Sequence, residues 1–494
     1  MGKPTGFMEY TRCQNPDVPA LERIRSYGEL HVPMDSKARR EQAARCMDCG
    51  VPFCQSGMRL GGSMTGCPLH NLIPEWNDLL YRGELSEAAG RLLMTNNFPE
   101  FTSRVCPALC EAACICGLHD SPVTTRDNEN FIIEQAFASG LMEPHPPCVR
   151  SEKHVAVIGS GPAGLACAAQ LNLRGHHVTV FEKADRPGGL LMYGIPNMKL
   201  DKSVIERRIR LMEAEGIEFR TGVEVGRDRK ASSILRKYDA VVLACGAGLP
   251  RDLDVPGRDA GGVHFAVEYL THATRAVLSG DPDSTPVTAK DRDVLIIGGG
   301  DTGNDCVATA VRQGAKSITQ LEITPRLPDT RAEDNPWPQW PRICKTDYGQ
   351  EEAAAVFGQD PRVYETTVQS LEKDGNGQVS AAKLVHVEWT ADPATGRRSP
   401  RPVEGSEWVQ PAQLVIIAAG FLGAQREVPE AFGTPLDARC RVETLGATHA
   451  TADPKVFTAG DMRTGQSLVV HAIADGRAAA REVDLALMGY TNLP

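Results

Sequence analysis

Eight of the 15 cysteines in this 494-residue chain lie between Cys46 and Cys116. They form three groups: Cys46-x2-Cys49-x4-Cys54, then Cys67-Pro68, then Cys106-Pro107-x2-Cys110-x3-Cys114-x-Cys116. Iron–sulfur clusters need thiolates that short loops bring together, and a proline directly after a ligand cysteine is frequent in ferredoxins. Structural zinc is the alternative, because Cys-x2-Cys is also a zinc spacing, but zinc does not account for the two Cys-Pro pairs. The spacing favours two four-iron clusters over zinc.

A glycine-rich turn predicts a dinucleotide site in the middle of the chain. The apolar stretch His154–Ile158 runs into Gly159, Gly161, Pro162, Ala163 and Gly164, a helical pattern follows, and the next strand ends at Glu182. The first glycine permits the tight turn, the second lets the backbone approach a pyrophosphate, and the third lets the helix pack on the strand. Glu182 is placed to bind ribose hydroxyls. The order of strand, turn, helix, strand and acid predicts a βαβ unit.

The same design recurs about 140 residues later, which indicates a second dinucleotide-binding unit. Val294–Ile297 enters a turn and helix start that contain Gly298, Gly300, Asp301, Thr302 and Gly303. Glu322 stands where an acid binds the ribose of NADH, whereas Arg326 is placed to meet the 2′-phosphate of NADPH. The choice between NADH and NADPH stays open. Later strands in the two units end in small-residue turns that add Gly246 to the first site and Gly420 to the second.

Near the C-terminus, a short strand ends at Gly460 and Asp461, and residues 465–480 read as a helix. The N-terminus of such a helix can face a flavin ring, where its positive dipole stabilises a reduced anionic flavin. A plain turn or helix-capping role is the alternative for Asp461. One unit for each of two dinucleotides is the construction of a flavoprotein reductase. Hydride transfer from nicotinamide to flavin needs no protein acid or base, so we assign no catalytic residue.

The sequence predicts an α/β protein with a helical iron–sulfur domain followed by two Rossmann-like units, the second inserted in the first. Residues 1–150 form the iron–sulfur domain, 151–288 and 425–494 the FAD-binding domain, and 289–424 the NAD(P)H-binding domain. The proline-rich Glu143–Pro147 is a linker. Residues 324–362, which include the segment Asn-Pro-Trp-Pro-Gln-Trp-Pro at 335–341, read as an irregular insertion. Its tryptophans form either a docking surface or a packed local core.

Composition and charge argue against several classes of protein. The chain carries 63 acidic and 53 basic residues, a net charge of −10, and no run of basic residues. We therefore expect no nucleic acid and no membrane as partner. No stretch approaches 18 apolar residues and the N-terminus lacks an apolar signal region. A cytoplasmic location is the expectation.

Taken together, these motifs resemble the small (β) subunit family of glutamate synthase. The similarity runs nearly end to end and includes GKPTGF, CMDCGVPFC, VCPALCEAAC, VIGSGPAG, RPGGLLMYGIPNMKL, GGGDTGND, NPWPQWP and TAGDMRTGQSLVVHAI. The resemblance implies FAD in the first unit, NADPH (or NADH) in the second and two 4Fe–4S clusters in the N-terminal domain. It also adds Gly189, Leu190, Ser467, Leu468 and Val469 to the FAD site.

The same resemblance implies a hetero-oligomer with a large subunit that holds FMN and a 3Fe–4S cluster. Electrons pass to that subunit, where glutamine and 2-oxoglutarate give glutamate. The alternatives are a reductase of the same architecture that serves ferredoxin or another acceptor, and a redox sensor without turnover.

The related N-terminal half of dihydropyrimidine dehydrogenase implies how the cluster ligands are shared. Carried over by motif, one cluster is held by Cys46, Cys49, Cys54 and Cys114. The other is held by Cys67, Cys106, Cys110 and a residue other than cysteine, for which Glu129 is the best match. This leaves Cys116 spare, whereas the simple count of eight cysteines uses it.

Overall fold

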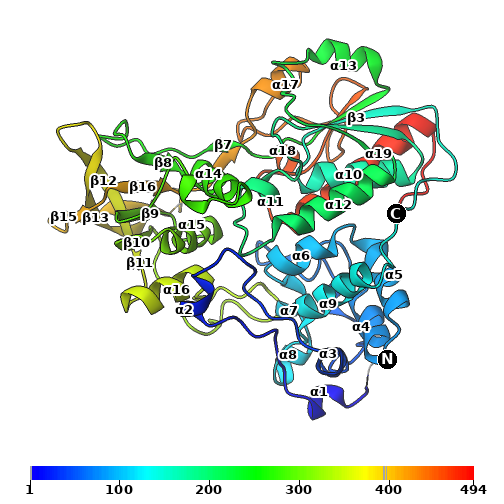
Figure 1. Ribbon diagram of the computed structural model, residues 1–494, viewed down its shortest axis with the longest axis horizontal. Helices are drawn as coiled ribbons and strands as arrows, with labels where there is room; N and C mark the ends of the chain where they lie inside the picture. Colours follow the sequence, from blue (N-terminus) through cyan, green and yellow to red (C-terminus); the bar gives the residue numbers. More distant parts are fainter. Residues whose placement is uncertain (1–2, 393–394, 397) are drawn as a thin grey trace.

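The computed structural model describes residues 3–392, 395–396 and 398–494, and its N-terminal third is built from short helices around the cysteine-bearing loops (Figure 1). These helices are α1 Gly6–Glu9, α2 Ala20–Arg23, α3 Ser36–Ala43, α4 Ile73–Arg82, α5 Leu85–Thr95, α6 Pro99–Val105, α7 Leu109–Ala112, α8 Cys116–His119 and α9 Thr125–Ala138. A 3₁₀ turn, η1 Phe53–Gln55, and a hairpin of β1 Met58–Leu60 with β2 Ser63–Thr65 lie between α3 and α4.

Local sequence explains where these helices begin and end. Asp35 caps α3 by accepting the Ala38 N–H at 2.9 Å. Gly83 adopts φ +88° and separates α4 from α5. The inward faces of α4 and α5 bury Trp76 and Leu92 completely. Truncating a buried tryptophan costs about 3–5 kcal/mol of stability, so this face anchors the domain.

The first nucleotide-binding unit has a five-stranded parallel sheet in the order β18-β6-β3-β4-β5. The strands are β3 His154–Ile158, β4 His177–Phe181, β5 Glu218–Arg220, β6 Ala240–Leu243 and β18 Val456–Thr458. Its helices are α10 Pro162–Leu173, α11 Leu190–Tyr193, α12 Lys202–Ala214, α13 Ala231–Lys237, α17 Glu427–Ala431, α18 Asp461–Thr464 and α19 Val469–Met488. Buried valines in β3 and β6 give the sheet the continuous apolar character of a parallel sheet that is covered on both faces.

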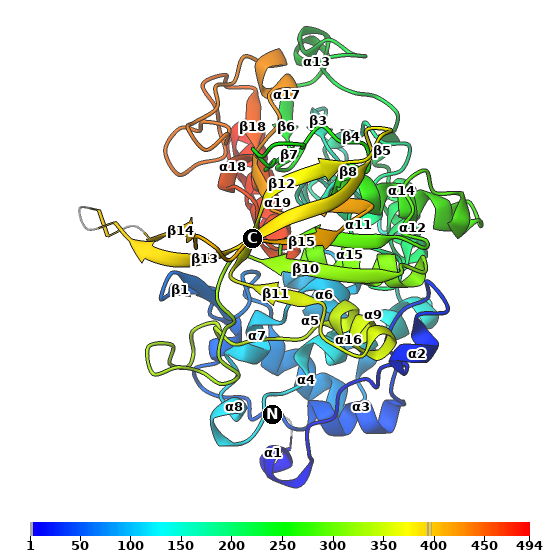
Figure 2. The ribbon, with the colours of Figure 1, turned by 90° about the vertical axis from the view of Figure 1, so that its left-hand side faces the viewer.

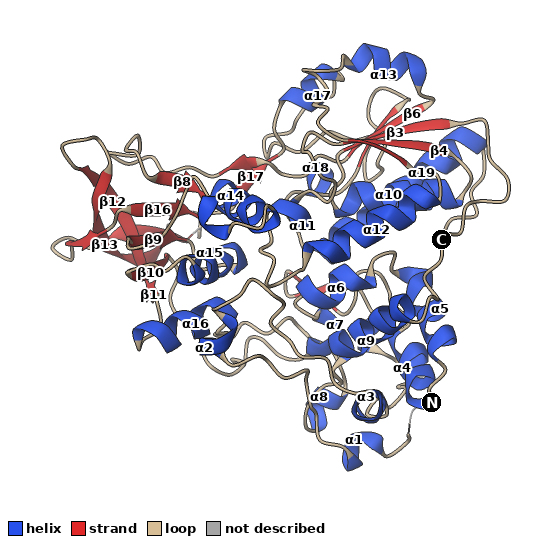
Figure 3. Ribbon diagram, viewed as in Figure 1, coloured by secondary structure: helices blue, strands red, loops and turns tan. Residues whose placement is uncertain are grey.

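The second unit has its own parallel sheet, in the order β11-β10-β9-β16-β8 (Figure 3). Its strands are β8 Val263–Phe265, β9 Asp293–Ile297, β10 Ser317–Glu322, β11 Arg362–Tyr364 and β16 Leu414–Ile417. Its helices are α14 Ala266–Leu278, η2 Pro282–Ser284, α15 Asp301–Arg312 and α16 Tyr348–Phe357. An antiparallel sheet covers the opposite face with β12 Thr366–Lys373, β13 Val379–Ala391, β14 Arg398–Pro402 and β15 Trp408–Pro411. The β13–β14 end projects from the body (Figure 2).

The chain returns to the first sheet only at β18, so the second unit is inserted in the first, as the sequence predicts. The boundary differs from the expected residue 289. β8 pairs in parallel with β16, and α14 packs on the second core, so both belong to the second unit. The chain crosses between the units through β7 Leu249–Pro250 and β17 Phe421–Gly423, which pair with each other. The β8–β16 pairing joins strands about 150 residues apart and leaves no local signal, which explains the misplaced boundary.

No helix within the described residues is long and apolar enough to cross a bilayer.

Candidate functional site: two cysteine groups beneath two dinucleotide sites

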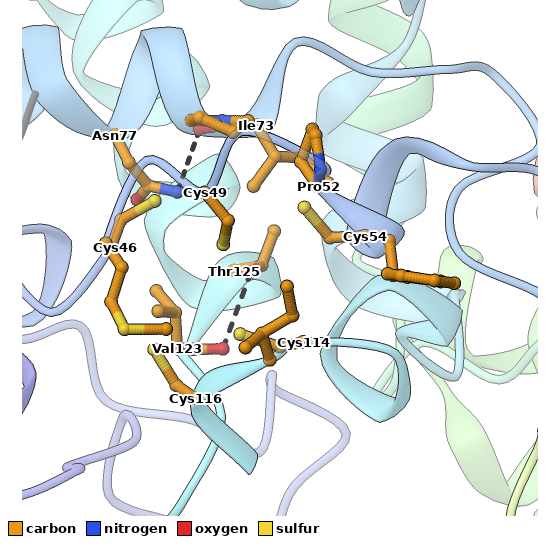
Figure 4. Close-up of a pocket in the computed structure, with 14 residues that line it drawn as sticks. Cys46, Cys49, Pro52, Cys54, Ile73, Asn77, Cys114, Cys116, Val123 and Thr125 are labelled. Atoms are coloured by element: carbon orange, nitrogen blue, oxygen red, sulfur yellow. Dashed lines mark hydrogen bonds between the residues drawn. The ribbon is translucent and has the colours of Figure 1, made fainter. Parts of the chain in front are cut away.

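Cys46, Cys49, Cys54 and Cys114 line one pocket in the helical domain, and we call these four the outer cysteine set (Figure 4). In Figure 4 the sulfurs of Cys49, Cys54 and Cys114 turn toward a shared space, with Cys46 at its margin. Burial raises the pKa of Cys46 to about 12 and also raises that of Cys54. Burial disfavours the thiolate form of these residues, and a bound metal centre would offset that penalty. The four cysteines predicted to form this set thus line one pocket, together with Cys116.

Cys67, Cys106, Cys110 and Glu129 form a second group, which we call the inner set. Burial raises the pKa of Cys67 to about 12 and that of Cys106 to about 11, with mutual repulsion and the Glu129 charge adding to it. Burial raises the pKa of Glu129 to about 8. Both recorded hydrogen bonds to Glu129 reach one oxygen, Oε1: Thr102 Oγ1 donates at 2.5 Å and Asn96 Nδ2 at 2.9 Å. The carboxyl group is thus held near the three thiols of the inner set.

Cys116 lines the outer pocket as a fifth cysteine. Its Sγ lies 3.5 Å from the Arg45 carbonyl oxygen, to which it donates. The Cys116 and Cys114 side chains also interact with each other, which lowers the pKa of Cys114, while the same interaction and burial raise the pKa of Cys116. Cys116 therefore shares the pocket of the outer cysteine set and lies beside Cys114.

The distances between possible metal-binding side chains bear on the choice between a zinc ion and an iron–sulfur cluster. Across residues 3–392, 395–396 and 398–494, no three Cys, His, Asp or Glu side chains are close enough to share a single metal ion. A tetrahedral zinc ion needs four donors within about 2.3 Å of one point, whereas a four-iron cluster holds its thiolates around a larger body. The described residues therefore show no ready-made site for a single zinc ion.

The first glycine-rich turn has the geometry that its three glycines predict. A Cβ on Gly159, which has φ +105°, would lie 2.4 Å from the Ala244 carbonyl oxygen, and one on Gly164 would lie 2.1 Å from the Gly159 oxygen. A Cβ on Gly161 would meet nothing within 4 Å, so the backbone there faces open space. Gly189 closes one side of this space, since its Cβ would lie 2.9 Å from Gly161 Cα. The N-terminus of α10 is free to receive a pyrophosphate.

Glu182 lies at the end of β4 and is buried beside this turn. Its Oε2 accepts hydrogen bonds from Ser160 N at 3.1 Å and Ser160 Oγ at 2.5 Å, and its Oε1 accepts from Ala184 N at 2.8 Å. A carboxylate has about four acceptor positions, so these bonds fix its orientation and leave capacity for a ribose hydroxyl. Ser160 was not among the predicted site residues, although its place inside the glycine-rich motif was a usable signal.

The C-terminal segment differs from the expected single helix. Asp461–Thr464 forms the short α18, Gly465 at φ +83° interrupts it, and the long helix α19 begins at Val469 with Leu468 as its N-cap. Gly476 lets α19 pack closely against α10, because a Cβ at this position would lie 2.1 Å from the Ala163 carbonyl oxygen. The close crossing of α19 and α10 places Gly460 against Ala163 as well. The glycine-rich turn at Gly159–Gly164 and the C-terminal segment at Gly460, both predicted to bind FAD, therefore lie next to each other.

Asp461 and Ser467 join across the Gly465 turn, since Ser467 Oγ donates to Asp461 Oδ1 at 2.8 Å. Burial raises the pKa of Asp461 to about 6. Leu190 begins α11 on the other side of the turn at Gly159–Gly164, and Gly246 has φ +73° with open space at its Cβ position.

The second glycine-rich turn repeats this geometry. A Cβ on Gly298 would lie 2.3 Å from the Ala418 carbonyl oxygen, and one on Gly303 would lie 2.2 Å from the Gly298 oxygen. Gly300 and Gly420 have open space at their Cβ positions. Asp301 and Thr302 are the first two residues of α15, whose N-terminus faces that space. The turn is therefore built to accept a second dinucleotide.

Glu322 ends β10 and accepts hydrogen bonds from Thr324 N and Thr324 Oγ1, both at 2.9 Å. It lies directly against the turn, because a Cβ on Gly299 would be 2.0 Å from Glu322 Oε2. Arg326 is exposed and donates to Asp329 Oδ1 at 2.6 Å. Both residues thus occupy the carboxyl edge of the second sheet, with the acid held in place and the arginine at the surface.

Buried contacts join the helical domain to the first unit. Arg208 of α12 forms a buried ion pair with Glu100 of α6, with Nη2 and Oε2 3.0 Å apart. The side-chain oxygen of Asn97 accepts from Gln170 Nε2 of α10 at 3.2 Å and from Arg477 Nη1 of α19 at 2.6 Å. α6 ends at Val105, next to Cys106. Cys106 of the inner set therefore directly follows a helix that is fixed to the first nucleotide-binding unit.

Family comparisons agree with this division of the chain. The model of the pyridine nucleotide-disulphide oxidoreductase family matches residues 149–341. The model of dihydropyrimidine dehydrogenase domain II, 4Fe–4S cluster, matches residues 23–141 and so covers both cysteine sets.

Among solved structures, *Mycobacterium tuberculosis* FprA aligns with a TM-score of 0.54 and 18% identity over 69% of this chain and 85% of that one. FprA in complex with NADPH aligns with a TM-score of 0.52 and 18% identity. At this identity the likeness shows the fold alone.

Curated relatives match the whole chain. The glutamate synthase [NADPH] small chain of *Bacillus subtilis* is 48% identical over 100% of both proteins, and that of *M. tuberculosis* is 46% identical over 100% of this chain and 98% of its own. The glutamate synthase [NADH] of *Schizosaccharomyces pombe* is 49% identical, and the present chain spans 23% of its length. With its 4Fe–4S domain and two nucleotide-binding units, this chain belongs to the glutamate synthase small-chain family of NAD(P)H-dependent flavin oxidoreductases.

Proposed function

We propose that this chain is the electron-input subunit of a glutamate synthase. It oxidises NAD(P)H at FAD and passes electrons through two 4Fe–4S clusters to a large subunit, where glutamine and 2-oxoglutarate give two glutamates. The observation that carries the proposal is the arrangement of the two cysteine sets in a helical domain whose α6 is fixed to the FAD-binding unit by the Arg208–Glu100 pair. Such a domain is placed to receive electrons from a flavin.

The residues of the first unit would hold FAD. The turn at Gly159–Gly164 and the N-terminus of α10 would bind the pyrophosphate, and Glu182 would bind the ribose. The N-terminus of α19 would lie near the flavin ring and stabilise negative charge there. Once bound, FAD accepts a hydride and releases its electrons singly.

The residues of the second unit would hold the pyridine nucleotide. Gly298, Gly300 and the N-terminus of α15 would bind its pyrophosphate, and Glu322 would bind the ribose next to adenine. Arg326 is placed to meet a 2′-phosphate, which supports NADPH, whereas Glu322 repels that phosphate and supports NADH. The two sites together align the reacting rings, and no side chain needs to move a proton.

We assign the outer cluster to Cys46, Cys49, Cys54 and Cys114, and the inner cluster to Cys67, Cys106, Cys110 and Glu129. Two features support these sets: the outer four line one pocket, and burial, with the Glu129 charge adding to it, raises the pKa values of Cys106 and Cys110. A carboxylate in place of a fourth thiolate changes the charge and hydrogen bonding of a cluster, which are levers on its reduction potential.

The test is anaerobic purification followed by flavin and iron analysis and separate titration with NADH and NADPH. We expect flavin absorbance over a broad iron–sulfur shoulder, bleached by one of the two nucleotides. Zinc in place of iron would contradict the cluster assignment, and absence of flavin would contradict the FAD site.

A second experiment separates this proposal from a reductase that serves another acceptor. Mixing the chain with a glutamate synthase large subunit should give a stable complex and NAD(P)H-dependent glutamate formation. A chain that reduces artificial acceptors but forms no such complex would support the other reductase.

A further inference from the structure

Residues 335–341 of the second nucleotide-binding unit lie against the cysteine-rich domain. The rings of Trp337 and Phe53 are 5.0 Å apart between centroids and tilted by 59°. Thr65 Oγ1 donates a hydrogen bond to the Pro338 carbonyl oxygen, across 273 residues of chain. Gln339 packs against Gly61, because a Cβ on Gly61 would lie only 2.6 Å from Gln339 Oε1. Figures 1 and 2 both show the segment between β10 and α16 reaching the helices around α7.

All three contacted residues lie between Cys49 of the outer set and Cys67 of the inner set. Phe53 immediately precedes Cys54 and lines the outer pocket. Thr65 is 2% exposed and stands two residues before Cys67. The contacts therefore fall on the wall of the outer pocket and on the stretch that leads to the inner set.

The loop has an internal frame of its own. Asn335 is buried, its Nδ2 donates to the Trp340 carbonyl oxygen at 3.0 Å, and its Oδ1 accepts the Arg342 N–H at 2.7 Å. Trp337 Nε1 is buried and makes no hydrogen bond to any part of the chain that the structure describes. A buried donor without a partner costs about 1–3 kcal/mol. Packing on Phe53 and the framed loop, rather than a hydrogen bond from the indole, hold this ring in place.

We propose that residues 335–341 cover the outer cluster site from another unit of the same chain, and that Trp337 is the residue that limits solvent access. Trp337 packs on Phe53 and so keeps water and dioxygen away from a cluster held by the outer cysteine set. The apolar shell of a metal site controls solvent access, and here a different unit of the chain supplies that shell. This inference rests on the proposed function, because it requires a cluster in that pocket.

The test is the lifetime of the cluster in air. Full-length protein is purified anaerobically as wild type, Trp337→Ala, Trp337→Phe and Trp340→Ala, diluted into air-saturated buffer, and followed by iron–sulfur absorbance and residual iron. Trp340 is the matched control, because its ring lies 4.1 Å from Lys345 Nζ within its own loop. We expect Trp337→Ala to lose its cluster about tenfold faster than wild type, as expected for loss of a protecting shell. Trp337→Phe, which keeps a ring against Phe53, should decay close to the wild-type rate, and so should Trp340→Ala.

Equal lifetimes for wild type and Trp337→Ala would overturn the inference, and so would equal acceleration by Trp337→Ala and Trp340→Ala. Where Trp337→Ala does not fold, Trp337→Leu replaces it, with the same expected loss and the same overturning result. Wild-type protein without iron would contradict the proposed function itself, before any variant is compared.

Discussion

Asp475 Oδ2 accepts the backbone N–H of Gly460 at 2.7 Å. The same carboxylate receives the Arg463 guanidinium, with Nε 3.2 Å from Oδ2, and its Oδ1 lies 3.3 Å from His449 Nε2. Gly460 has φ +70° and begins the turn that carries Asp461. A side chain on α19 therefore fixes the loop that we assign to the flavin, and the glycine-rich motifs give no sign of it.

Asp475→Asn should weaken FAD binding without unfolding the chain. The amide keeps the size of the carboxylate but loses its charge, and charge-assisted hydrogen bonds contribute about 1.5–3 kcal/mol each. We expect the Kd for FAD to rise about tenfold, measured by quenching of flavin fluorescence on adding FAD to flavin-stripped protein. Glu482→Gln is the control, because Glu482 contacts His449 but makes no recorded bond to Gly460. Equal loss in both variants would show that the His449 network, not the Gly460 contact, matters.

Cys110→Ser and Cys116→Ser should separate a cluster ligand from its neighbour. Loss of the inner cluster in Cys110→Ser removes about half of the bound iron, whereas Cys116→Ser should keep all of it. Iron analysis of protein purified under argon measures both. If Cys116→Ser also loses about half of the iron, Cys116 is a ligand and the simple count of eight cysteines holds.

Glu129→Ala should remove the inner cluster. The variant leaves Thr102 Oγ1 and Asn96 Nδ2 without their shared acceptor and leaves three thiols without a fourth ligand. We expect about half of the iron to be lost, with Glu129→Asp intermediate because its carboxylate is one methylene shorter. Thr102→Val tests the alternative that the hydrogen-bond network alone stabilises the site. Full iron content in Glu129→Ala would remove this residue from the ligand set.

Arg326→Ala should discriminate between the two pyridine nucleotides. Arg326 is exposed at the carboxyl edge of the second sheet, and only NADPH carries the 2′-phosphate that it would meet. We expect KM for NADPH to rise about tenfold and KM for NADH to stay within about twofold. Steady-state reduction of an artificial acceptor with each nucleotide gives both values. A parallel rise for the two nucleotides would place Arg326 elsewhere than at the 2′ position.

Asp461 should make the FAD-free protein less stable as the pH rises. Burial raises its pKa from 3.8 to about 6 in the folded state. The unfolded chain therefore releases this proton first, so stability is full below about pH 4 and is lost as the pH rises through about 6. We expect wild type to lose about 1 kcal/mol between pH 5 and pH 7.5 relative to Asp461→Asn, in urea unfolding of flavin-stripped protein. Identical pH dependence in both proteins would contradict the buried setting of this carboxyl.

The sequence by itself determined the elements whose signals are local. Gly159, Gly161 and Gly164 are spaced for one turn, and Gly298 with Gly303 repeats it, so both βαβ units are readable from a few consecutive residues. The cysteine spacing likewise indicates clusters, because ligand loops are short. The sequence signal for the break at Gly465, after which α19 begins at Val469, is weaker. A glycine inside a helical pattern can be tolerated within the helix or can end it.

Only the tertiary structure decided which distant residues meet. β8 joins the second sheet through β16, Asp475 reaches Gly460 through the crossing of α10 and α19, and Trp337 reaches Phe53 from another unit. Each contact depends on how whole elements pack, and packing depends on shape and burial that no spacing rule encodes. The sequence thus names the groups that can do the chemistry, while the packed fold determines which of them hold, cover and orient one another.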